Sequence, residues 1–354
     1  SGSCAKSEAD FLIQDLSLPL LLGVFALAGA IVVAASIRAT ALADLIADRT
    51  KLGEAMAGGI LLGGATSLSG VVVSVTAAYG GDASFAVSNA VGGIAAQTLF
   101  LGLADLFYKR VNLEHAAAEP ANLFQAVMLL ILLSMPIAAM AGPDIAYFGV
   151  SPVSLVMFLG YLWGVRLSSI VGERPMWRPV ETSDTRKDEP DEENDPNAPV
   201  MRPALIFVGL VAIMGLSGWV ISQVAGTFIT RYELSSSLVG ALITAIITSL
   251  PELVTTLVAV RRGALQLAVG GIIGGNTFDT LFLVFSDVAY RDGSIFQAVG
   301  ETDLYWLATG MLMTAILLGG LILRQREGPA RIGIESVLLI AIYCCAVAVE
   351  LFAP

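Results

Sequence analysis

The second half of this chain repeats a long stretch of the first half, 182 residues further on. Residues 58–110 and 240–292 align without a gap and are identical at 17 of 53 positions. The identities include polar residues, with Thr66–Leu68 returning as Thr248–Leu250, and pairs of glycines. Apolar composition alone does not keep such residues in register, so the sequence indicates an internal duplication. In an apolar chain, a duplicated half is typical of transporters whose substrate site lies where two repeats meet.

The composition places the chain in a membrane. Of its 354 residues, 56% are hydrophobic and only 14% are charged, whereas soluble domains carry roughly 25% charged residues. Ten apolar segments each have about 20 residues or more, the length that crosses a ~30 Å hydrocarbon core. We therefore predict an all-α integral membrane protein with ten transmembrane helices, arranged as two inverted five-helix repeats. The predicted helices span residues 17–37, 52–78, 83–108, 122–142, 146–166, 203–228, 235–260, 264–290, 303–323 and 332–352.

The basic residues predict the orientation. Of the 19 Lys and Arg residues, 16 flank the loops of one side, and only Lys6, Arg231 and Arg291 fall on the other. The richer side is expected to be cytoplasmic, so both termini are predicted to be extracytoplasmic, in a prokaryotic-type inner or plasma membrane. Because each half has five helices, an odd number, the second repeat starts on the opposite side of the membrane from the first and is therefore inverted. The predicted parts are an extracytoplasmic N-terminus (1–16), a first repeat (17–166, duplicated segment 52–108), an acidic cytoplasmic linker (167–202) and a second repeat (203–354, duplicated segment 234–290).

Two carboxylates lie midway along predicted membrane helices, Glu252 in the seventh and Asp279 in the eighth. A carboxylate at bilayer depth costs about 2.5–3.5 kcal/mol on insertion scales, so such residues are candidates for binding ions or protons. The structural alternative is a buried pair that is neutralised by protonation or by hydrogen bonds.

The neighbours of these carboxylates favour ion binding. Pro251 removes a backbone donor and frees carbonyl groups one turn earlier, and Thr248 and Ser249 add hydroxyl oxygens. In the eighth segment Asn276 lies three residues before Asp279, on the same helical face. Carboxylate, carbonyl, hydroxyl and amide oxygens together are the ligands of hard cations such as Na⁺ and Ca²⁺.

The sequence Thr248-Ser249-Leu250-Pro251-Glu252, followed by glycine-rich Gly274-Gly275-Asn276 and Asp279, resembles the second alpha-repeat of the calcium/cation antiporter superfamily, which includes the sodium/calcium exchangers. The resemblance implies a secondary active cation antiporter that exchanges Ca²⁺ for Na⁺ or H⁺ by alternating access, with Glu252 and Asp279 as the metal-binding carboxylates. The further ligands that it implies are Thr248, Ser249 and Asn276 from the second repeat, and Thr66, Ser67, Asn89 and Gln97 from the first.

The first repeat departs from this pattern. Ser69 and Gly70 stand where the family has proline and glutamate, and Ile94 replaces its second asparagine. Two carboxylates balance one Ca²⁺, two Na⁺ or two protons, whereas three Na⁺ would leave a buried surplus charge. A monovalent Na⁺ or K⁺/H⁺ antiporter is therefore an alternative interpretation. A channel and a non-transporting relative are further alternatives.

No nucleotide-binding motif is present in the sequence, so an ion gradient is expected to drive the protein, which is not expected to be an enzyme. The expected partners are the lipid bilayer and small inorganic cations, with no nucleic acid, nucleotide or cofactor apart from the transported cations; the oligomeric state stays open. We further expect Asp105 and Asp287 to pair with Lys109 and Arg291 four residues on, although a role in admitting ions is possible for them. Lone His115 is expected to be solvated, and Cys344 and Cys345 are expected to be small core residues.

Overall fold

The computed structural model describes residues 13–50, 63–108, 112–117, 119–180, 200–325 and 333–352. Within these ranges the regular structure is helical, and eight helices are long and apolar enough to cross a membrane. Two further segments meet at an angle of 43° and pass the same test of length and composition together, as one bent span. The class of an all-α membrane protein is therefore confirmed. The eight helices are α2 (Leu18–Thr50), α5 (Ala83–Phe107), α7 (Pro120–Ala141), α8 (Pro152–Glu173), α9 (Met201–Tyr232), α13 (Leu265–Ala289), α15 (Glu301–Leu323) and α16 (Ile334–Phe352).

The bent span consists of α10 (Ser236–Leu238), a π-helical stretch (Val239–Thr244), α11 (Ala245–Thr248) and α12 (Leu250–Arg262). Its counterpart in the first repeat is α4 (Gly63–Tyr79). Residues 51–62, which precede α4, lie outside the described residues, so a total of ten spans stays a prediction.

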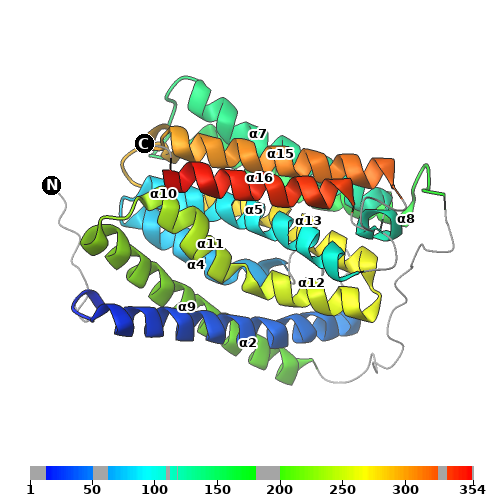
Figure 1. Ribbon diagram of the computed structural model, residues 1–354, viewed down its shortest axis with the longest axis horizontal. Coiled ribbons are helices and arrows are strands. Elements are labelled where there is room, and N and C mark those ends of the chain that lie inside the picture. The colour runs from blue at the N-terminus through cyan, green and yellow to red at the C-terminus, as the bar shows by residue number, and fades with distance from the viewer. Residues whose placement is uncertain are drawn as a thin grey trace.

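The helices form three groups (Figure 1). α4, α5, the bent span and α13 make the centre, where α4 packs on α13 and α5 packs on the bent span. α2 and α9, the first helices of the two repeats, pack together along one side of this centre, while α7, α8, α15 and α16 cover the other side. α5 and α13 are the most deeply buried spans, with 78% and 72% of their most apolar windows inside the protein. The centre of the bundle is therefore made mainly of the duplicated segments.

Small residues let the central helices approach closely. A side chain at Gly240, in the π-helical stretch, would meet the backbone of α5 at Phe85 O, 2.8 Å from the added Cβ. A side chain at Gly92 on α5 would likewise collide with the backbone of Ala241. Glycine at both positions thus sets the distance between α5 and the bent span.

The two repeats complete each other through a pair of buried aspartates. Asp105, near the end of α5, accepts hydrogen bonds from Leu113 N (2.8 Å) and Gly333 N (3.0 Å). Its counterpart Asp287 accepts from Ile295 N (2.9 Å) and Ser151 N (2.7 Å). Ile295 is the repeat counterpart of Leu113, and Ser151 is the repeat counterpart of Gly333, in each case 182 residues away. Each aspartate therefore caps a short helix of its own repeat and the fifth helix of the other repeat.

Asp287 is bound by backbone N–H groups and not by the expected ion pair with Arg291, while the pairing of Asp105 with Lys109 stays a prediction. A backbone N–H that points at a buried carboxylate forms a charge-assisted hydrogen bond, and each aspartate receives two of them. Asp287 also accepts from Ser154 Oγ at 2.6 Å. Lys109, the expected partner of Asp105, lies outside the described residues.

We expect Asp287→Ala to destabilise the protein strongly, because it leaves Ser151 N, Ile295 N and Ser154 Oγ without their acceptor. Each buried donor left unpaired costs about 1–3 kcal/mol, so the loss is about 3 kcal/mol or more. Thermal unfolding in detergent measures it, with Asp292→Ala, an exposed acid that follows α13, as the control. Equal melting temperatures for the two variants would contradict this role of Asp287.

Three other expectations are wrong. α2 continues to Thr50 instead of ending near residue 37, so Arg38 lies on the helix. His115 is buried in the short helix α6 (Leu113–Ala117), where its Nδ1 lies 2.7 Å from Arg324 O, because α6 packs against α15. Cys344 and Cys345 are exposed on the surface of α16 and are not core residues.

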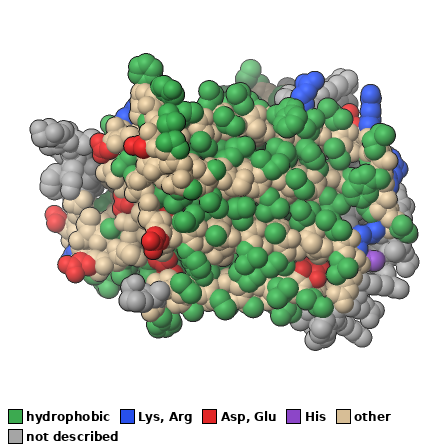
Figure 2. Space-filling view, turned by 90° about the horizontal axis from the view of Figure 1, so that it is seen from above, with side chains coloured by type: hydrophobic (Ala, Val, Ile, Leu, Met, Phe, Trp, Pro, Cys, Tyr) green, Lys and Arg blue, Asp and Glu red, His purple; other side chains and the backbone are tan. Residues whose placement is uncertain are grey.

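The surface is apolar along the helices and charged at the ends. Hydrophobic side chains cover the middle of the face seen in Figure 2, while acidic side chains gather toward one end and Lys and Arg toward the other. This distribution is that of a protein whose middle faces lipid.

Candidate functional site

The break in the bent span carries the first carboxylate. α11 ends at Thr248, Ser249 leaves the helical conformation (φ −94°, ψ 0°), and α12 begins with Pro251 in its first turn. Proline has no N–H and favours the start of a helix, so this position allows the break predicted from the sequence. Glu252 follows in the first turn of α12 and is only 5% exposed. There it also benefits from the positive end of the helix dipole.

The second carboxylate meets its own repeat counterpart. Gln97 Nε2, on α5, donates to Asp279 Oδ2, on α13, at 2.6 Å. These residues are 182 positions apart, so they are equivalent in the two repeats. The pseudo-twofold axis of the protein therefore passes between them. Gln97 Nε2 also lies 3.4 Å from Ser249 Oγ, which links this pair to the break.

A symmetric pair of glycines makes room for these side chains. A Cβ on Gly93 would lie 3.5 Å from Ser249 Oγ and 3.9 Å from Asp279 Oδ2. A Cβ on its counterpart Gly275 would lie 3.2 Å from Gln97 Oε1. Larger side chains at either position would enter the space between the two repeats.

α4 brings hydroxyl groups from the first repeat to the same place. Thr66 and Ser67 lie next to the Glu252 carboxylate, and Ser67 also faces Asp279. The two carboxylates are themselves electrostatic neighbours. Six of the nine predicted ligands therefore meet between α4, α5, α13 and the break: Glu252, Asp279, Ser249, Thr66, Ser67 and Gln97.

Three predicted ligands have other contacts. Asn89 donates to Gly70 O and Ser74 Oγ and accepts from Thr244 Oγ1 at 2.6 Å, so its amide joins α4 to the π-helical stretch. Thr248 Oγ1 donates to Thr244 O at 2.9 Å, inside its own helix.

Asn276 lies one turn before Asp279 and donates to Thr98 Oγ1 at 2.9 Å. Its carbonyl oxygen has no partner of its own.

Several acceptor oxygens of the site are not used by its hydrogen bonds. Within the described residues, no hydrogen bond of normal geometry reaches either oxygen of Glu252, Asp279 Oδ1, Asn276 Oδ1 or Gln97 Oε1, although all these atoms are buried. A buried acceptor without a donor is costly. An array of such oxygens is suited to a positively charged ligand, which satisfies several acceptors at once.

The position of the missing first-repeat glutamate is filled by an aromatic ring. A Cβ on Gly70 would lie 2.6 Å from Phe282 Cε2 and 3.6 Å from Thr248 Oγ1. Phe282 belongs to α13, the helix that carries Asp279. The first-repeat half of the site is thus closed by an apolar side chain, and the site is asymmetric.

Sequence reasoning missed the aromatic residues around the site. Phe278 packs edge-on against Tyr161 of α8, with ring centroids 6.0 Å apart, and Tyr161 is an electrostatic neighbour of Asp279. Phe278 directly precedes Asp279, which was the only available signal; nothing in the sequence connects Tyr161 to them.

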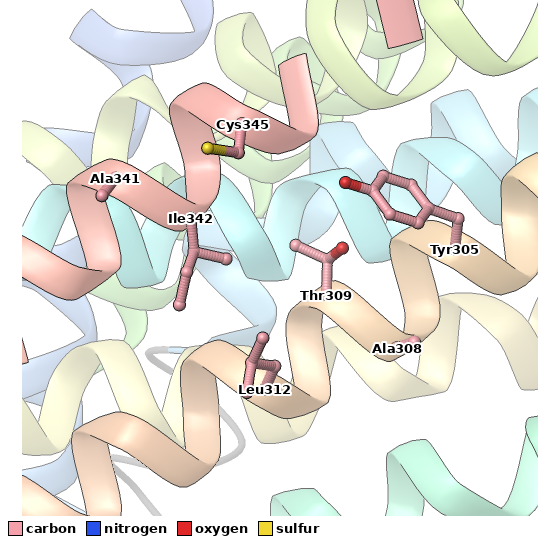
Figure 3. A pocket seen from close by; sticks show the side chains of 7 residues that line it. All are labelled: Tyr305, Ala308, Thr309, Leu312, Ala341, Ile342 and Cys345. Carbon is pink, nitrogen blue, oxygen red and sulfur yellow. The ribbon is translucent and has the colours of Figure 1, made fainter. Parts of the chain in front are cut away.

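A groove on the outside of the bundle lies on other elements. It runs between α15 and α16, and in Figure 3 the side chains of Tyr305, Thr309 and Cys345 point into it. Its lining is almost entirely apolar, and it shares no residue with the carboxylate site. It is completed by Ala308, Leu312, Ala341 and Ile342.

Comparison with known families assigns the chain. The model of the family described as sodium/calcium exchanger protein matches residues 20–166 and 202–352. The chain belongs to the sodium/calcium exchanger family. The two matched segments start 182 residues apart, so the family comparison finds the same duplication as the sequence.

Proteins similar to this chain match most of its length, and two solved structures share its fold. Inner membrane protein YrbG of Escherichia coli K12 is 27% identical over 271 residues, which are 75% of this chain and 77% of YrbG. The sodium-calcium exchanger NCX_Mj superposes with a TM-score of 0.62 at 18% identity, over 94% of this chain and 99% of that one. The H⁺/Ca²⁺ exchanger CAX superposes with a TM-score of 0.63 at 15% identity, over 97% and 91% of the two chains.

Proposed function

We propose that this exchanger is a secondary active antiporter that binds Ca²⁺ at Glu252 and Asp279 and exchanges it for Na⁺ or H⁺. The observation that carries the proposal is the set of buried, unpaired oxygens of Glu252, Asp279, Asn276 and Gln97. Ser249, Thr66, Ser67 and Thr248 add hydroxyl groups around it, and Asn89 holds α4 against the bent span. The two solved exchangers with the same fold handle Ca²⁺ according to their names, which agrees with this ligand set.

The charge of the site favours an electroneutral cycle. Glu252 and Asp279 supply two negative charges, while Gly70 and Gln97 at the related positions supply none. One Ca²⁺, two Na⁺ or two protons match these charges. A third Na⁺ would be a buried surplus charge, which costs several kcal/mol.

A monovalent Na⁺ or K⁺/H⁺ antiporter is the second candidate function. Phe282 packs on Gly70 and closes the first-repeat half of the site. A divalent cation with a coordination number of six to eight needs more oxygen atoms than a small monovalent one, so this loss of ligand space favours the second candidate.

The helices that move to give alternating access are α2 and α9. They pack on each other and on α4 and α12 from one side, whereas the other outer helices pack on the opposite side of the centre. In this proposal they move across the site, and the fixed centre holds the cation. The end of the bundle with the basic residues Arg166, Arg261 and Arg262 faces the cytoplasm, so both termini are extracytoplasmic in an inner or plasma membrane.

Tracer flux into proteoliposomes tests the function. Vesicles are loaded with Na⁺ or set to a low internal pH, and uptake of labelled Ca²⁺ and Na⁺ is measured with and without each gradient. We expect Ca²⁺ uptake that depends on one of the gradients and carries no net current. Movement of Na⁺ or K⁺ against protons, without Ca²⁺, would establish the monovalent exchanger instead. Absence of flux for all these ions would contradict both.

A further inference from the structure

A second group of carboxylates is buried at the end of the bundle where α15 ends and α16 begins. Glu114 lies on α6, in the connection between α5 and α7, and is fully buried. Glu335 lies in the first turn of α16 and is 4% exposed. These two residues come from different repeats and take no part in the site around Glu252. Asp105 is a further electrostatic neighbour of Glu114.

One oxygen of each glutamate has no partner. Glu114 Oε2 and Glu335 Oε1 are buried, and no described residue donates a hydrogen bond to them. Both lie next to the same point beside Gly333: a Cβ there would be 3.3 Å from Glu114 Oε2 and 3.1 Å from Glu335 Oε1. Both unpaired oxygens therefore lie close to Gly333, and a side chain at this position would crowd them.

Two other polar groups of this region, among the described residues, already have partners. Ser336 Oγ donates weakly to the other oxygen of Glu114, at 3.4 Å. Asp105 is held by Leu113 N and Gly333 N.

Two basic groups among the described residues, Arg324 and His115, contact backbone carbonyls. The Arg324 guanidinium donates to Val180 O and His115 O, and His115 Nδ1 contacts Arg324 O. α13 also packs on α6, but its titratable residues, Asp279 and Asp287, lie in its second half.

Electrostatics then favour a proton in this group. Burial is the largest cause and the neighbouring charges of Asp105 and Glu335 add to it, which together raise the pKa of Glu114 to about 8. Burial and neighbouring negative charges both favour the protonated form of Glu114. A metal ion is a poorer occupant, because the described residues contain no cluster of three or more His, Cys, Asp or Glu side chains that could hold one.

We propose that Glu114 and Glu335 form a proton-binding site, separate from the exchange site, that takes up one proton from the water at this end of the protein. The proton sits on one glutamate and is donated to the unpaired oxygen of the other. Because α6 belongs to the first repeat and α16 to the second, the shared proton fastens the two repeats together. Its release at high pH leaves two neighbouring negative charges and weakens that junction.

The sign of the pH dependence follows from proton binding. Between about pH 4.5 and 8 the folded protein holds a proton that the unfolded chain has lost, so stability falls as the pH rises through this range. We expect the melting temperature of the purified protein in detergent to fall between pH 5.5 and 9. In Glu114→Gln, which resembles the protonated acid, the part of this fall that is due to the pair disappears.

A set of variants separates the pair from other titrating groups. Glu335→Gln removes the neighbouring charge, so the fall moves to lower pH, and the double variant behaves like Glu114→Gln, without additivity. Glu173→Gln, an exposed acid at the end of α8, is the matched control and keeps the wild-type profile. The assay requires no transport, so its result is independent of the proposed exchange activity.

Three results would overturn the proposal. The first is a pH profile of Glu114→Gln that equals the wild-type profile, and the second is failure of this variant to fold at pH 6. The third is stabilisation of the wild type by added Ca²⁺ at constant pH that Glu114→Gln loses and Glu252→Gln keeps, because it would identify the pair as a metal site.

Discussion

Glu252→Gln is expected to abolish cation exchange while the protein still folds. Glutamine has nearly the same shape as glutamate, so the change removes the charge and one acceptor while the Thr66 and Ser67 hydroxyls keep a carbonyl oxygen beside them. Removing one partner of a buried charge pair costs about 3–5 kcal/mol, which corresponds to a loss of cation affinity on the order of 100-fold or more. Asp279→Asn is expected to behave in the same way.

Two measurements decide this result. Labelled Ca²⁺ and Na⁺ binding to the purified protein reports affinity, and flux into proteoliposomes reports exchange. Glu301→Gln, an exposed acid at the start of α15, is the matched control and keeps wild-type values. Wild-type flux in both Glu252→Gln and Asp279→Asn would remove the carboxylates from the mechanism and, with them, the proposed site.

Gly70→Glu, which restores the glutamate of the family pattern, is expected to harm this protein. The new Cβ alone would lie 2.6 Å from Phe282 Cε2. Forcing extra atoms into a packed interior costs about 1–3 kcal/mol, and a third buried carboxylate near Glu252 and Asp279 adds to this cost. We expect a clearly lower melting temperature and loss of exchange. Gly64→Ala on the same helix is the control, since its Cβ makes only an ordinary contact of 3.6 Å with Phe278.

The substitution Phe282→Ala tests whether the ring is the obstacle. Alone it leaves a cavity and costs about 3–5 kcal/mol. Combined with Gly70→Glu, it is expected to cost less than the sum of the two changes, because the glutamate occupies the space of the ring. Additive losses would contradict the view that Phe282 took the place of the missing side chain.

The sequence predicted the parts of this protein that depend on local chemistry. The duplication placed Gln97 and Asp279 at equivalent positions, and Pro251 marked the helix break that carries Glu252. Both features depend on residues close to one another in the chain or on a fixed offset between repeats. The fold class follows from the same observations, because the apolar segments have the length of membrane helices.

Other features depend on contacts between distant segments, which a single sequence does not reveal. In the sequence, Gly70 indicates only that a glutamate ligand is missing. The packing of α13 on α4 is what brings the Phe282 ring to the space that the glutamate side chain would occupy. His115 reads as a loop residue, yet the fold of α6 under α15 buries it. Glu114 and Glu335 are 221 positions apart, and no motif links them. The hydrogen bonds of Asp105 and Asp287 to backbone groups were hidden for the same reason, since an acceptor of main-chain N–H groups leaves no pattern of residue types.

The exchange of aspartate caps between the repeats has a consequence for synthesis of the protein. The first-repeat Asp105 finds one of its two backbone donors only at Gly333, immediately before the last helix. When the ribosome has made the first five helices, this carboxylate is still incompletely bonded, and the start of α8 still lacks Asp287. Neither half can therefore reach its final structure before the other is inserted. Two halves expressed as separate chains are expected to assemble only when both are present in the same membrane.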